Sequence, residues 1–190
     1  MKLKFLFGRL WRLTMSPRME WENIVNASPA DDVASAFVYP LASVCGCAVL
    51  IGGLVRNGLT NGGWWISLSQ ACITAFGLLA CFWLTAWAAN EVRMRYLQLE
   101  SDMPACLTLT GYSMGVYMAL VMFTGLFPEL AVFRYVLQFY TAYVVWQGAD
   151  LVTEVDEERR MTFALIVTAL LLFIPFLFGF IFNRLSAIVV

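Results

Sequence analysis

Histidine is absent from the 190 residues, and lysine occurs only at Lys2 and Lys4. The chain therefore lacks the commonest general base and the commonest metal ligand, and its apolar segments cannot hold a serine–lysine dyad. Charged residues make up only 13% of the chain, against about 25% in a typical soluble domain. The 12 basic and 13 acidic residues nearly cancel, which excludes nucleic-acid binding through a broad basic surface. We expect no catalytic site, no cofactor and no metal centre.

Cysteine is scarce as well, and its five positions do not indicate a disulfide framework. An odd number of cysteines, all within or beside apolar runs, favours small packing residues over paired thiols. Cys45 and Cys47 are two positions apart, so on a helix their side chains point about 200° away from each other. This pair is therefore a poor chelator of a single metal ion.

Apolar residues are abundant: they form 61% of the chain, and the mean hydropathy is +0.75. Five apolar stretches are long enough to cross about 30 Å of hydrocarbon as helices. They cover residues 33–55, 64–89, 105–127, 130–152 and 161–182. We predict an all-α fold, a five-helix transmembrane bundle preceded by an N-terminal amphipathic interfacial helix. Residues 1–30 would form a cytoplasmic interfacial segment, and residues 31–190 would form the membrane domain.

The distribution of Lys and Arg predicts the orientation in the membrane. With five spans, the N-terminal segment and the second and fourth connections share one side, and they hold nine of the 12 basic residues. Cytoplasmic loops carry an excess of Lys and Arg. The N-terminus is therefore predicted to be cytoplasmic and the C-terminus to lie outside.

The first 15 residues combine an apolar helical face with basic residues, as in helices that lie on a membrane surface. Leucine and phenylalanine recur at helical spacing between Leu3 and Leu13. The candidate membrane-surface residues are Lys2, Lys4, Arg9 and Arg12. The alternative is that this helix docks on the bundle. A second short helix is expected to begin at Ser16–Pro17, because these residues suit an N-cap and the first helical position.

A Gly-x-Ser-x-Gly pattern in the third predicted span has two interpretations. In serine hydrolases this pattern places the nucleophile on a strand-to-helix turn beside a histidine, but here it lies within an apolar stretch of a chain without histidine. Glycines four residues apart instead favour close helix packing. The candidate packing residues are Gly111, Tyr112, Ser113 and Gly115. The partner of this face is either the chain itself, a second copy or another protein.

The fourth predicted span carries a polar stripe near its inner end. Tyr143, Gln147 and Asp150 share one helical face by their spacing. Such a face lines a water-filled cleft in some transporters, or it simply meets water at a helix end. Both interpretations remain open from the sequence.

Three short signals accompany the five-span layout: Ser16-Pro17 with Trp21, Val38-Tyr39-Pro40, and Gly111-Tyr112-Ser113. With these signals the chain resembles the Yip domain family, the Ypt/Rab-interacting membrane proteins, in its bacterial branch. The resemblance implies five spans, a cytoplasmic N-terminus and residence in the bacterial cytoplasmic membrane. The Asp-Leu-Tyr-Gly-Pro motif of eukaryotic members is replaced by residues 31–35, Asp-Asp-Val-Ala-Ser, so binding of a Rab-type GTPase is not implied.

The predicted function is that of a non-enzymatic membrane scaffold or adaptor. Its partners would be membrane lipids and another membrane protein or a second copy of the chain. The alternative is a small transporter or lipid-scrambling subunit that uses the polar face of the fourth span.

Overall fold

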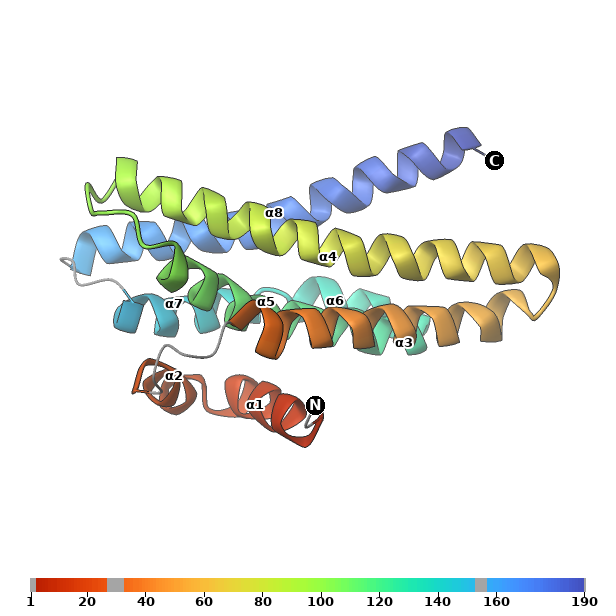
Figure 1. The fold of residues 1–190 in the computed structure, drawn as a ribbon, viewed down its shortest axis with the longest axis horizontal. Helices are drawn as coiled ribbons and strands as arrows, with labels where there is room; N and C mark the ends of the chain where they lie inside the picture. The colour runs from red at the N-terminus through yellow and green to blue at the C-terminus, as the bar shows by residue number, and fades with distance from the viewer. Residues whose placement is uncertain (1–2, 27–32, 153–156, 190) are drawn as a thin grey trace.

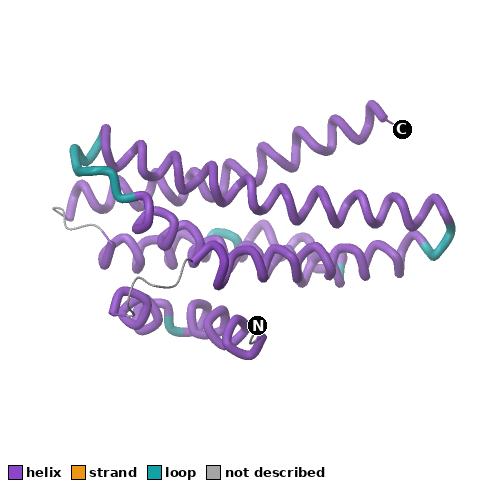
Figure 2. The backbone as a smooth tube through the Cα atoms, viewed as in Figure 1, coloured by secondary structure: helices purple, strands orange, loops and turns teal. Residues whose placement is uncertain are grey.

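The computed structural model describes residues 3–26, 33–152 and 157–189, and those residues fold into helices joined by short connections (Figure 1, Figure 2). Two short helices come first, α1 (Leu3–Met15) and α2 (Pro17–Asn26). A π-helical turn, η1 (Ala34–Val38), leads directly into α3 (Tyr39–Asn57). The remaining elements are α4 (Asn61–Arg95), α5 (Met103–Leu126), the 3₁₀ turn η2 (Pro128–Leu130), α6 (Ala131–Leu137), α7 (Tyr140–Val152) and α8 (Glu157–Val189). The all-α prediction is confirmed.

Local sequence signals account for the ends of the long helices. Gly58 ends α3 with a φ of 72°, a conformation that glycine adopts without steric cost. Thr60 then caps α4 by accepting a hydrogen bond from the Gly63 amide at 3.3 Å. Asp102 caps α5 in the same way, accepting from the Ala105 amide at 3.0 Å, and Pro104 lies in the first turn. These caps fix the turns between the predicted first, second and third spans.

Four helical segments of the described chain are long and apolar enough to cross a membrane. They are Ala34–Asn57, Gly62–Arg95, Met103–Leu126 and Glu157–Phe182. α3, α4 and α5 pack on one another, and α8 packs mainly on α4 and α7. The N-terminal helices lie along one side of this bundle, near the end at which α4 ends and α8 begins (Figure 1).

The predicted fourth span, residues 130–152, is not one continuous helix as expected. It is divided into η2, α6 and α7, with a junction at Gln138–Phe139. At this junction the chain tightens: the Phe139 amide bonds to the Val136 carbonyl at 3.3 Å, and the Thr141 amide bonds to the Gln138 carbonyl at 3.0 Å. These are bonds across three residues, as in a 3₁₀ turn. Because they pair backbone groups through the break, the segment still meets a basic requirement for lying in lipid. That it crosses the membrane remains a prediction.

Candidate functional site: the docked N-terminal layer

The N-terminal layer, defined here as α1 and α2, packs on the bundle through buried side chains. The leucines of the expected apolar face, Leu6, Leu10 and Leu13, are all buried. α1 contacts α5, and α2 contacts α7. The leucine face of α1 is therefore docked on the bundle, as the alternative interpretation of this helix expected. The opposite face of α1 is also apolar, and Phe7, Trp11 and Met15 are exposed on it.

A buried carboxylate holds the two helices of the layer together. Glu20 of α2 is only 2% exposed, and it accepts from Arg9 Nε at 3.1 Å and from Arg12 Nε at 2.7 Å. The Arg9 side chain is 13% exposed, whereas that of Arg12 is 51% exposed. The hydrogen bond to Glu20, and then its negative charge, raise the pKa of Arg12 above its ordinary value. Both arginines are thus directed toward Glu20.

Tyr112 of α5 connects this ion pair to the bundle. Its hydroxyl accepts a hydrogen bond from Arg9 Nη1, and the Arg9 guanidinium carbon lies 5.3 Å from the centre of its ring. The ring also meets Trp21 edge-on at 5.9 Å and Phe37 at 4.9 Å between centroids. Contacts of this kind stabilise by about 0.5–1.5 kcal/mol each beyond simple burial. One tyrosine therefore joins α1, α2 and η1 to α5.

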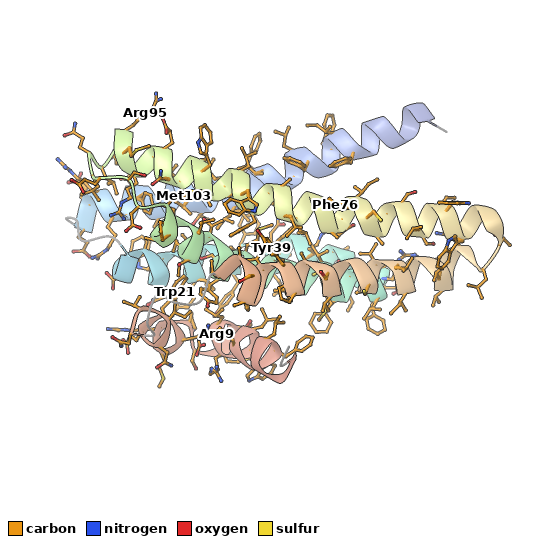
Figure 3. The ribbon with its side chains drawn as sticks, viewed as in Figure 1. Arg9, Trp21, Tyr39, Phe76, Arg95 and Met103 are labelled. Carbon is orange, nitrogen blue, oxygen red and sulfur yellow. The ribbon has the colours of Figure 1, made fainter. Side chains whose placement is uncertain are left out.

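Two further hydrogen bonds attach the layer to α7. Trp21 is fully buried, and its indole Nε1 donates to the Val144 carbonyl at 3.0 Å. Tyr140 donates from its hydroxyl to the Thr14 carbonyl at 2.8 Å. Gly148 makes room for the indole, since a Cβ at this position would lie 2.5 Å from Trp21 Cε2. Figure 3 shows Arg9 and Trp21 on the layer beside the bundle.

Comparison with known proteins identifies the family. The sequence model of the Yip1 domain matches residues 11–179, which is most of the chain. The chain belongs to the Yip1 domain family. No curated protein and no solved structure matches the chain. The matched region begins inside α1, so the Yip1 domain includes Glu20, Trp21 and the whole of α2.

The predicted packing residues of the Yip1 domain lie together in the middle of α5. Gly111 and Gly115 are buried, and side chains of η1 fill the space above them. A Cβ on Gly111 would lie 3.1 Å from Val38 Cγ2, and a Cβ on Gly115 would lie 2.9 Å from two ring atoms of Phe37. The glycines thus leave room for side chains of the same chain. Ser113 is fully buried on a different face of the helix.

The three polar residues of the fourth predicted span do not share one partner or environment. The Asp150 carboxylate Oδ1 lies 2.8 Å from Arg160 Nη1 of α8, and its side chain is 47% exposed. Tyr143 is also exposed, at 48%. Gln147 is half-buried. The ion pair of Asp150 joins the end of α7 to the start of α8 at the surface of the described structure.

The predicted membrane-surface residues divide into two groups. Arg9 and Arg12 point toward Glu20, as described above. Lys4 lies in the first turn of α1, and Lys2 lies outside the described residues. The sequence did not indicate Glu20 as their partner, because the two arginines and the carboxylate lie on separate helices. The α1–α2 turn that joins them depends on tertiary packing.

Proposed function

We propose that this Yip1-domain protein is a non-enzymatic membrane scaffold or adaptor that binds another membrane protein, with lipid covering the rest of its apolar surface. The proposal is supported by the exposure of α8. Only 22% of the most apolar stretch of this helix is buried within the chain, against 61% for α5. A membrane helix with so few contacts of its own leaves a long surface for a neighbour.

The exposed face of α8 is built from large aromatic side chains. Phe173, Phe176 and Phe180 are 54–65% exposed. The C-terminal half of α8, which contains Pro175, runs away from α4 (Figure 1). Apolar side chains gain nothing by leaving lipid for another apolar surface, so association here depends on close packing. Gly179 offers that possibility, because a Cβ at this position would meet no atom within 4 Å.

Catalysis by Ser113 is not part of the proposal. A serine nucleophile needs an adjacent base. The chain has no histidine, and its two lysines are both in the first four residues. The hydroxyl of Ser113 is buried without a hydrogen-bond partner among the described residues. A packing or ligand-holding role therefore suits this serine better.

Site-specific photocrosslinking in native membranes tests the scaffold proposal. We expect p-benzoylphenylalanine at Phe176 to give a single protein adduct of defined mass, because this position lies on the exposed face of α8. The same probe at Phe123, which is 51% exposed on α5, serves as the matched control and should give lipid adducts. Lipid adducts alone at both positions would contradict a protein partner on α8.

The proposal includes an orientation in the bacterial cytoplasmic membrane. One end of the bundle, where α4 terminates and α8 begins, carries Arg93, Arg95 and Arg160. Arg56 lies in the last turn of α3, at the opposite end of the bundle. The positive-inside rule then assigns the first of these ends to the cytoplasm. The N-terminal layer lies on the same half of the bundle (Figure 1).

Reporter fusions at the two termini test this orientation. A reporter fused before Met1 should report a cytoplasmic location. A reporter fused after Val190 should report an extracytoplasmic location. This result requires residues 128–152 to cross the membrane in spite of the junction at Gln138–Phe139. Two termini on the same side would show that this segment enters the membrane and returns.

A further inference from the structure

Four hydroxyl groups are buried in the bundle with no hydrogen-bond partner among the described residues. They belong to Thr85 of α4, Thr110 and Ser113 of α5, and Thr141 of α7. Each of these residues is at most 1% exposed. A buried polar group without a partner loses the hydrogen bonds it would have in water and gains none in return. Four such groups would remove a large part of the stability of an ordinary domain.

These four residues differ from many other serines and threonines in the helices of the described structure. A hydroxyl in a helix usually bonds to the carbonyl four residues earlier. Among the described residues, side chains that do this at distances between 2.8 and 3.1 Å include Thr14, Ser43, Ser67, Thr74, Thr108, Thr124 and Thr162. The four unpartnered hydroxyls make no hydrogen bond to the carbonyl four residues earlier in their own helix.

The faces of α5 show where Thr110 and Ser113 are directed. Gly111 lies against η1 and Phe82 of α4, and Tyr112 lies against the N-terminal layer. Thr110 and Ser113 are three positions apart and share a different face. Since the faces toward η1 and toward the N-terminal layer are occupied by Gly111 and Tyr112, the face of Thr110 and Ser113 is turned toward the remaining side of the bundle. On that side α8 contacts both α4 and α7.

The depths of the hydroxyls along the bundle also agree. Phe82 lies beside Gly111, and the two helices are antiparallel, so Thr85 is close to the level of Thr110. On the other side, a Cβ at Gly148 would lie 2.8 Å from Leu109 Cδ1. Counting back along α7 from this contact places Thr141 within about one helical turn of the level of Ser113 along the bundle. Three helices thus contribute hydroxyls to one stretch of the interior.

We infer that these residues form a hydroxyl seam that binds ordered water inside the bundle. Water can donate to and accept from each hydroxyl, and buried water commonly satisfies such groups. The four side chains are uncharged hydroxyls, so the seam suits a neutral ligand such as water. It offers no carboxylate to balance the charge of a cation. Cys106 precedes Thr110 by one turn on the same face of α5, and it is 1% exposed. Its thiol therefore reports on water in the seam.

Hydroxyl-radical footprinting by synchrotron radiolysis of the intact protein tests this inference, because radicals formed from bound water label adjacent side chains. We expect Cys106 to be oxidised several-fold faster than Cys45, which is equally buried but lies at the α3–α5 contact. Thr110→Val should abolish this difference, because it removes a hydroxyl without changing the size of the side chain. Thr110→Ser should retain it.

A stability measurement on the same variants provides a second readout. Thr110→Val should lower the melting temperature, since the remaining hydroxyls lose a shared water. Thr108→Val is the matched control with a back-bonded hydroxyl, and we expect little change there. A higher melting temperature for Thr110→Val, or equal labelling of Cys106 and Cys45 in the unmodified protein, would overturn the inference.

Discussion

Replacing Glu20 by glutamine is expected to lower the free energy of unfolding by about 3–5 kcal/mol, the usual cost of removing one partner of a buried ion pair. The physical reason is that the substitution removes the negative charge that faces Arg9, whose side chain is only 13% exposed. The N-terminal layer should then detach, and trypsin should cleave the variant at Arg18 much faster.

Glu22→Gln is the matched control on the same helix. Glu22 is 53% exposed and lies 3.6 Å from Arg18, one helical turn away. Pairs of this kind contribute less than about 1 kcal/mol, so its melting temperature and proteolysis should be nearly unchanged. The double variant Glu20→Met with Arg9→Met should recover part of the loss, because no charge remains buried. Equal effects of Glu20→Gln and Glu22→Gln would contradict a buried pair.

The predicted helices follow from signals that are local in the sequence. The apolar runs predicted the four long segments, and the Asp102 cap with Pro104 in the first turn accounts for the start of α5. Ser16–Pro17 gave the start of α2. A cap or a proline acts on its own turn of the chain, so its effect can be read without knowing the fold. The junction at Gln138–Phe139 lacks such a signal, since neither glycine nor proline is present there.

The position of α1 could not be decided from the sequence, because apolar residues surround most of the helix. Leu10 faces the bundle and Trp11 faces away. A pattern of this kind suits a helix held between protein and lipid, whereas hydrophobic periodicity identifies only one apolar face. The pairing of Trp21 with Gly148 was equally hidden, because the two residues are far apart in the chain and meet only through the fold.

The glycines show the same limit in another form. Spacing indicated Gly111 and Gly115, and these residues make room for side chains of η1. A close approach between helix backbones instead joins Gly52 of α3 to Gly125 of α5. These two residues have no common motif, because each lies on its own helix. Spacing within one helix cannot identify a pair that forms across two.

Replacing Gly52 by alanine is therefore expected to destabilise the bundle by about 3 kcal/mol, at the upper end of the usual cost of overpacking. The new Cβ would collide with the carbonyl oxygen of Gly125 and lie 2.9 Å from its carbonyl carbon. Both atoms belong to the backbone, so no side-chain rotation relieves the overlap, and α3 and α5 must move apart.

The same substitution at Gly77 of α4 is the control, because a Cβ there meets nothing within 4 Å. Alanine favours a helix over glycine by about 1 kcal/mol, so Gly77→Ala should raise the melting temperature in detergent while Gly52→Ala lowers it. Similar melting temperatures for the two variants would show that α3 and α5 do not approach each other this closely.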